Sequence, residues 1–196
     1  MNDHKGFFAM MARMKYIERW VLMRNSVSEN ICEHSLEVAM LAHGLGIIGR
    51  KRFGKDLSPE RLAMLGMYHD CTEIITGDMP TPVKYANDEL KEAYKAIEDS
   101  AAHRLLEMLP EDLRAEYESY FLPEQITPEE YRYVKAADKL SALIKCIEEE
   151  KTGNQEFRSA KQATYESLQQ MNMPEVTVFC EVFLPEYYKT LDELEH

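Results

Sequence analysis

The sequence predicts an all-α, single-domain helical bundle spanning residues 1–196. Apolar residues recur with helical spacing along most of the chain, and no stretch alternates convincingly between apolar and polar residues as a half-buried strand would. Glycine and proline are sparse, with eight residues of each, and no repeat, low-complexity tract or flexible linker interrupts the pattern. A chain of 196 residues, 45% hydrophobic and 30% charged, suits one globular domain.

The first elements are expected to be two helices, over about residues 6–20 and about residues 31–50. On the second helix we assign the apolar side to Leu36, Ala39, Met40 and Ile47. Ser58 and Pro59 then start a third helix, because serine is a favoured N-cap and proline a favoured first helical residue.

The third helix is expected to continue through His69 and Asp70, within a strongly apolar segment. It is followed by a loop that contains Gly77, Pro80 and Pro82. A long helix over about residues 87–109 comes next, and Pro110 ends it.

A further helix start is Thr127-Pro128-Glu129-Glu130, which combines a capping box with proline at the first helical position. The helix should run to about Lys151. Its apolar stripe is Val134, Ala137, Leu140, Ile144 and Ile147. Two further helices are expected over residues 155–170 and 174–193, giving six to nine helices in all.

Charge and composition restrict the class of protein. The formal net charge of −12 should repel nucleic-acid polymers, because binding them depends on neutralising phosphates, but it allows a small phosphorylated substrate at a local cationic site. No signal peptide and no apolar run of about 20 residues is visible, so we expect a cytoplasmic protein without a membrane span. The four cysteines form no C-x-x-C pair and should be reduced thiols.

Four residues on three predicted helices suggest a metal site: His34, His69, Asp70 and Asp138. A histidine and an aspartate among apolar residues are costly unless both find partners, and a divalent ion satisfies both. Two imidazoles with two carboxylates suit Mn, Fe, Co, Ni or Zn better than Ca or Mg. Each residue taken alone is more often a hydrogen-bonded core residue, so the joint pattern carries the prediction. His43 should face the opposite side of its helix from His34 and be structural.

Other residues could support chemistry on a phosphate. Glu73 would share a helix face with Asp70 and could accept a proton from metal-bound water, although an exposed first-turn glutamate is the competing interpretation. Asp78 follows in a loop stiffened by prolines, where an Asx-turn is the alternative. Arg19 could bind a phosphate through two parallel hydrogen bonds, and Trp20 could form one wall of a pocket for a sugar or base. The alternative is that the pair serves packing alone.

These residues resemble the signature of the HD-domain phosphohydrolase superfamily, which is His34, His69-Asp70 and Asp138 in that order on helices. The resemblance is closest to YfbR-type bacterial 5′-deoxynucleotidases and extends from Phe7 to about Glu193. It rests on the segments Arg19-Trp20, Glu29-Asn30, Glu33-His34-Ser35-Leu36, Met67-Tyr68-His69-Asp70, Glu73, Thr76-Gly77-Asp78-Met79-Pro80-Thr81-Pro82-Val83-Lys84 and Val134-Lys135-Ala136-Ala137-Asp138. This chain has Cys71-Thr72 where Ala-Ser is common in that family, and Met79 where Leu is common.

The resemblance implies an all-α fold of the HD-domain type and hydrolysis of deoxyribonucleoside 5′-monophosphates to deoxyribonucleoside and phosphate. It also implies one divalent transition metal, with cobalt or manganese favoured over iron, nickel or zinc, and a homodimer. By position, the metal ligands would be His34, His69, Asp70 and Asp138, of which His34 and Asp138 also contact substrate. Arg19 would orient the phosphate and Glu73 would aid proton transfer. The substrate pocket would be lined by Trp20, Asp78, Met79, Pro80 and Thr81.

Other functions stay open at this point. Related enzymes cleave cyclic dinucleotides, nucleoside triphosphates or alarmones, and a non-catalytic nucleotide-sensing module is a further possibility. Only His103 lies between Asp70 and Asp138, which disfavours a two-metal site, and Lys84 is the only cation in residues 74–84, which favours a monophosphate. A cysteine hydrolase is disfavoured because Cys71 lies about 200° around a helix from His69.

Overall fold

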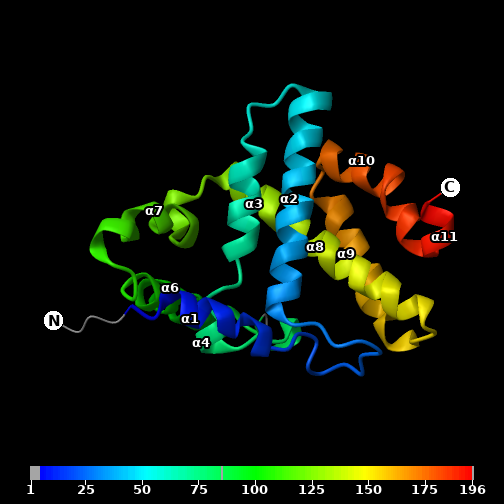
Figure 1. Ribbon diagram of the computed structural model, residues 1–196. Helices are drawn as coiled ribbons and strands as arrows, with labels where there is room; N and C mark the ends of the chain where they lie inside the picture. The colour runs from blue at the N-terminus through cyan, green and yellow to red at the C-terminus, as the bar shows by residue number, and fades with distance from the viewer. Residues whose placement is uncertain (1–4, 85, 196) are drawn as a thin grey trace.

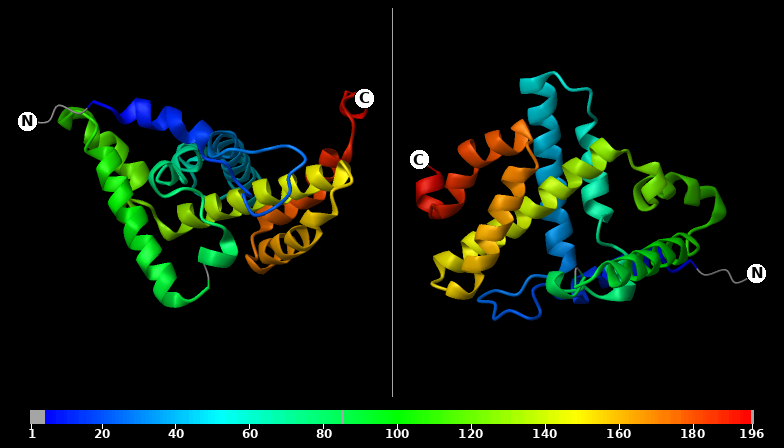
Figure 2. Two further views of the ribbon diagram at one scale, coloured as in Figure 1. Left: turned by 90° about the horizontal axis from the view of Figure 1, so that it is seen from below. Right: turned by 180° about the vertical axis from the view of Figure 1, so that it is seen from behind.

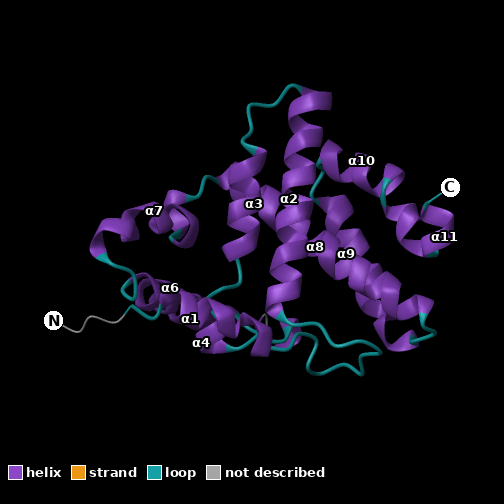
Figure 3. Cartoon of the chain, viewed as in Figure 1, coloured by secondary structure: helices purple, strands orange, loops and turns teal. Residues whose placement is uncertain are grey.

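The computed structural model describes residues 5–84 and 86–195, in which helices are joined by loops (Figures 1 and 3). In these residues the only β feature is an isolated antiparallel bridge between Glu18 and Asn30. The α-helices are α1 Phe7–Met11, α2 Ile31–Phe53, α3 Pro59–Tyr68, α4 Glu73–Thr76, α5 Thr81–Lys84, α6 Asp88–Leu106, α7 Glu111–Phe121, α8 Pro128–Lys151, α9 Arg158–Gln170, α10 Pro174–Val182 and α11 Leu191–Leu194. The 3₁₀ helices are η1 Ala12–Tyr16, η2 Pro123–Gln125, η3 Gln155–Phe157 and η4 Leu184–Tyr188. The all-α prediction is confirmed.

Helix α2 is the central element, with α3 along one side and α8 crossing it (Figure 1). It begins at a capping box, in which the Asn30 side chain accepts from the backbone of Cys32 and Glu33, and it ends where Gly54 adopts φ of 65°. By length and hydropathy α2 could cross a membrane, but more than half of its apolar window is buried inside the protein. It is therefore the core helix of the bundle.

The predicted apolar side of α2 is wrong in part. Leu36 and Met40 are 55% and 61% exposed, whereas Val38, Ala42 and Leu45 are fully buried. The segment has apolar residues on nearly every side, so periodicity alone leaves its orientation ambiguous. The contacts of α2 with α3 and α8 decide which side is buried.

The boundaries of the early elements also differ from the prediction. The first helix ends at Met11, η1 follows, and Ile17 is already extended, so residues 17–30 form a loop rather than the end of a helix. Helix α3 stops at Tyr68, and His69 and Asp70 occupy the turn between α3 and α4. This turn frees the two side chains from the regular 100° spacing of a helix.

In the C-terminal half the long helix α8 and its buried stripe are confirmed, as is the capping box at Thr127. Helix α6 ends at Leu106, before Pro110, so the predicted end of this helix is wrong by about one turn. Pro110 is instead the N-cap of α7, a helix absent from the prediction. The single helix expected over residues 174–193 is divided into α10, η4 and α11. Pro185 lies within η4, where it cannot donate a backbone hydrogen bond to continue α10.

Two buried clusters of apolar residues lie along α2 and α3. Val38 of α2 and Leu62 of α3 belong to the larger cluster, which α8 also lines. Ile31 at the start of α2 and Cys71 after the end of α3 belong to the smaller cluster beneath α1, α6 and α7. His34 and His69 lie between these positions in the chain and so fall at the junction of the two clusters.

Candidate metal centre and substrate pocket

The two histidines are oriented by hydrogen bonds at Nδ1. In His69, Nδ1 donates to the carbonyl of Gly66, 2.7 Å away, one turn earlier on α3. In His34, Nδ1 lies 2.9 Å from the hydroxyl of Ser141 on α8. Both Nε2 atoms are buried and have no hydrogen-bond partner among the described residues. The two rings lie 5.2 Å apart, so the two free nitrogens can face one ligand.

Two carboxylates complete this cluster. Asp70 Oδ2 lies 3.0 Å from His69 Nε2 and 3.5 Å from His34 Nε2, and Asp138 Oδ1 lies 3.3 Å from His34 Nε2. Ligand atoms of His34, His69 and Asp70 all lie within 4.8 Å of one another, a spacing that suits a single ion. The four residues predicted from sequence are thus brought together from α2, α8 and the turn after α3.

The electrostatics of the cluster fit a bound cation. Burial alone would raise the pKa of Asp70, but His69 and His34 hold it well below its usual range, and Lys135 and His34 do the same for Asp138. Burial would lower the pKa of His34, but its contacts with Asp138, Asp70 and Glu29 raise it well above its usual value. Two carboxylates therefore stay ionised here, which suits the binding of a divalent ion.

A second layer of residues supports the ligands. The hydroxyl of Ser141 donates to Glu37 Oε2 at 2.5 Å and can therefore accept from His34. Lys135 Nζ lies 3.1 Å from Asp138 Oδ2. Such outer contacts fix the orientation of metal-binding side chains.

Arg19 and Trp20 lie beside the cluster in the loop of residues 17–30. Arg19 Nη1 lies 3.4 Å from Asp70 Oδ2, and its side chain is 11% exposed. The indole Nε1 of Trp20 donates to Glu29 Oε2 at 2.8 Å, and the indole packs 5.3 Å from the ring of Phe157. Arg19 therefore contacts the metal cluster directly, whereas Trp20 is linked to it through Glu29 and also packs against Phe157.

Glu73 and Asp78 bring two more carboxyl groups to the same region. Glu73 is buried, and burial together with the charges of Asp70 and Asp78 raises its pKa to about 10. Burial also raises the pKa of Asp78, against the opposing charge of Arg19 and a hydrogen bond from the backbone of Trp20. The alternative of an exposed first-turn glutamate is wrong for Glu73.

The remaining predicted pocket residues follow in the chain. Met79 and Pro80 are half-buried, and Thr81 is exposed at the start of α5. Their place in the pocket stays a prediction. His43 and His103 are exposed and outside the cluster, as expected for His43.

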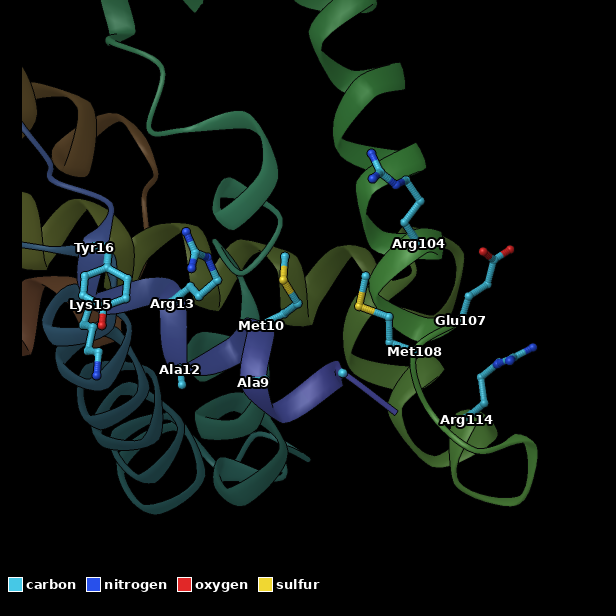
Figure 4. Close-up of a pocket in the computed structure, with 11 residues that line it drawn as sticks. Ala9, Met10, Ala12, Arg13, Lys15, Tyr16, Arg104, Glu107, Met108 and Arg114 are labelled. Atoms are coloured by element: carbon cyan, nitrogen blue, oxygen red, sulfur yellow. The ribbon is translucent and has the colours of Figure 1, made fainter. Parts of the chain in front are cut away.

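A separate cavity of about 940 Å³ lies between the N-terminal segment and α6 and α7 (Figure 4). Basic side chains line it, but Arg13, Lys15, Arg104 and Arg114 point in different directions and do not converge on one anion (Figure 4). None of the residues predicted for the metal centre lines this cavity.

Four residues of this region were not assigned a role from sequence: Glu29, Glu37, Lys135 and Ser141. Three of them could have been found from helical spacing. Glu37 follows His34 by three positions, and Lys135 and Ser141 flank Asp138 at three positions on either side, which places each on the face of a ligand. Glu29 lies in a loop, where no periodicity points to it.

The chain matches a known protein family over most of its length. A family described as 5′-deoxynucleotidase YfbR-like matches residues 6–187. The 5′-deoxynucleotidase of Vibrio cholerae serotype O1 is 48% identical over 96% of this chain and 97% of its own. The 5′-deoxynucleotidase YfbR of Shigella boydii serotype 18 is 46% identical over 96% of this chain and 94% of its own.

Solved structures share the fold. An HD-domain phosphohydrolase from Listeria innocua superposes with a TM-score of 0.80 at 22% identity, covering 96% of this chain and 91% of its own. The cyanophage S-2L HD phosphohydrolase DatZ, solved with dA and one catalytic Zn²⁺ ion, superposes with a TM-score of 0.64 at 23% identity, covering 93% and 96%. With a family match over nearly its whole length, this chain belongs to the 5′-deoxynucleotidase YfbR-like family.

Proposed function

We propose that this protein hydrolyses deoxyribonucleoside 5′-monophosphates to deoxyribonucleoside and inorganic phosphate, using one divalent metal held by His34, His69, Asp70 and Asp138. The observation that carries the proposal is the pair of buried Nε2 atoms, without hydrogen-bond partners, that face two ionised carboxylates. The names of relatives at 46–48% identity supply the substrate class.

A divalent metal in this centre would act as a Lewis acid on the phosphate and lower the pKa of a bound water. Cobalt or manganese is our first expectation for its identity, and the Zn²⁺ of the cyanophage structure makes zinc a further metal to test. A ligand set of two imidazole nitrogens and two carboxylates suits cobalt, manganese and zinc.

The side chains around the metal centre then have distinct tasks. Arg19 lies beside Asp70, so its guanidinium can hold the phosphate against the metal centre and balance charge on the equatorial oxygens. Glu73, whose pKa is raised to about 10, can carry a proton near neutral pH, to or from the attacking water or the leaving 5′-oxygen. Asp78, whose pKa is also raised by burial, is the second candidate for this proton transfer.

Recognition of the nucleoside falls to the neighbouring segments. The Trp20 indole stands beside Arg19 and can fill the space that a 2′-hydroxyl would need. Met79, Pro80 and Thr81 follow Asp78 closely and complete the pocket in this proposal. We further propose that the protein works as a cytoplasmic homodimer without binding nucleic-acid polymers or membranes.

The test is a screen for phosphate release from deoxy- and ribonucleoside monophosphates with Co²⁺, Mn²⁺, Zn²⁺ and Mg²⁺, before and after chelation. Hydrolysis should favour deoxynucleotides and stop on chelation. Asp138→Ala should lose at least about 100-fold in kcat/KM, because it removes a ligand. The exposed Asp56→Ala is the matched control and should keep full activity. Activity that survives the chelator and persists in Asp138→Ala would contradict the metal mechanism.

A further inference from the structure

Glu29 contacts three residues of the proposed active site with one carboxylate. Its Oε2 accepts a hydrogen bond from Trp20 Nε1 at 2.8 Å. Its Oε1 lies 3.4 Å from Arg19 Nε and 3.4 Å from His34 Nδ1. The Glu29 side chain is only 14% exposed, so these contacts are made largely away from solvent.

The backbone places Glu29 opposite Arg19. The amide of Arg19 donates to the Glu29 carbonyl at 2.8 Å, and the amide of Ile31 donates to the Ile17 carbonyl at 3.0 Å. These two bonds frame the antiparallel bridge between residues 18 and 30. Because Asn30 caps α2, which carries His34, the position of Glu29 is fixed relative to the metal centre.

The conformation of Trp20 needs such support. Its backbone has φ of 57°, which is unfavourable for a residue with a bulky side chain and persists only where the surroundings hold it. Asn25 Nδ2 donates to the Trp20 carbonyl at 3.2 Å, and Phe157 packs against the indole. Glu29 is the only described side chain that accepts from the indole nitrogen, and it therefore fixes the direction of the ring.

Glu29 also orients Arg19 by charge. It pairs with Nε, which leaves the terminal nitrogens of the guanidinium toward Asp70 and a phosphate beside the metal centre.

We propose that Glu29 is a positioning residue that fixes Arg19 and Trp20 relative to His34, and thereby sets phosphate orientation and the preference for deoxyribose together. The part that concerns deoxyribose rests on the function proposed above. The part that concerns Trp20 does not, because Trp20 is the only tryptophan in the chain and its fluorescence reports on the contact directly.

The experiment compares Glu29→Ala and Glu29→Gln with wild type and with Glu33→Ala. Glu33 is the matched control, since it is exposed and only closes the capping box at the start of α2. Two readouts are used: the emission of Trp20 in chelator-treated protein, and kcat and KM for dAMP and AMP with Co²⁺. Circular dichroism verifies that each variant is folded.

Glu29→Ala should red-shift the Trp20 emission and lower kcat/KM for dAMP by about 10–100-fold, because both substrate groups lose their orientation. It should also reduce the ratio of dAMP to AMP activity. Glu29→Gln keeps an acceptor for the indole but loses the charge, so it should hold the emission near that of wild type and raise KM more than it lowers kcat. Glu33→Ala should resemble wild type in both readouts.

The proposal is overturned if Glu29→Ala keeps the emission and the substrate ratio of wild type, or if Glu33→Ala reproduces its changes. If Glu29→Ala does not fold, the KM of Glu29→Gln tests the proposal: a raised KM supports it and an unchanged KM overturns it. Should wild type hydrolyse neither nucleotide, the proposed function fails, and the emission of the variants still decides whether Glu29 positions Trp20.

Discussion

At the scale of single residues, the metal centre depends on which nitrogen of each histidine is engaged. His69 donates from Nδ1 to a backbone carbonyl, and His34 is linked through Ser141 to Glu37. These bonds leave Nε2 of each ring facing Asp70 and Asp138. Ring orientation is therefore set before any ion binds, which reduces the entropy lost on binding.

Glu73 should give the metal-free protein a measurable pH dependence. Its pKa of about 10 in the folded protein lies above the ordinary value of 4.5, so its contribution to stability is complete below about pH 4.5 and is lost as pH rises toward 10. Glu73→Gln cannot ionise. In chelator, the free energy of unfolding of this variant relative to wild type should increase with pH, by at most about 1.4 kcal/mol per pH unit.

Urea unfolding at a series of pH values between 5 and 9 measures this difference. Glu92→Gln is the control, since Glu92 is exposed on α6 and its replacement should leave the pH dependence of wild type unchanged. If the free energy of unfolding changes with pH in the same way for wild type and Glu73→Gln, the prediction is contradicted. Glu73 would then have the same pKa in the folded protein as in the unfolded chain.

At the scale of elements, close contact between α2 and α3 brings the two histidines together. A Cβ atom added at Gly66 would lie 3.0 Å from both Ala39 Cα and the Val38 carbonyl oxygen, and one added at Gly46 would lie 3.0 Å from Pro59 Cα. Glycine at these positions therefore lets the two backbones approach. Gly66 also provides the carbonyl that orients His69, so the close approach and the metal centre are coupled.

Gly66→Ala should separate the helices, because its Cβ meets backbone atoms that cannot rotate away. We expect a loss of about 1–3 kcal/mol of stability and weaker binding of Co²⁺, measured by urea unfolding and by metal titration. Gly44→Ala is the matched control, since the added Cβ has no atom within 4 Å, and it should be neutral or stabilise by up to about 1 kcal/mol. Equal behaviour of the two variants would contradict the role of the close contact.

A second element-scale feature is the anchoring of the loop that carries Arg19 and Trp20. On α8, the buried Glu149 accepts from the backbone amide of Ser26 at 2.8 Å and from Lys145 Nζ at 2.5 Å. Lys145 also donates to the Val27 carbonyl. The loop thus reaches across to the C-terminal part of α8 (Figure 2), the helix that supplies Asp138.

At the scale of the whole molecule, the proposed site joins the two apolar clusters. Residues of α2, of α8 and of the turn after α3 meet there, so an ion bound by them would link elements far apart in sequence. In a chain of net charge −12, Arg19 and Lys135 place positive charge beside this candidate centre.

Metal should therefore stabilise the entire fold. Adding Co²⁺ or Mn²⁺ at about 100 times its Kd should stabilise the folded state by about 2.7 kcal/mol and raise Tm, and chelator should reverse the shift. His69→Ala should abolish the shift in a thermal unfolding scan. The control His103→Ala, at an exposed histidine, should retain it. A full shift in His69→Ala would place the ion elsewhere.

Local signals in the sequence determined the fold class, the starts of α3 and α8, the buried stripe of α8 and the residue types of the candidate metal centre. Caps, proline positions and helical periodicity act within a few residues, so they can be read without the partner elements. The resemblance to the HD-domain superfamily added an expected activity and substrate class to these candidate ligands.

Only the tertiary structure decided which side of α2 is buried, where the first helix ends, and that Glu29 links Arg19, Trp20 and His34. Each of these depends on which surfaces meet across long distances in the chain. An apolar residue such as Leu36 could face either the core or solvent, and a loop carboxylate has no periodicity to reveal its partners. Packing and long-range hydrogen bonds choose among options that local sequence leaves nearly equal in free energy.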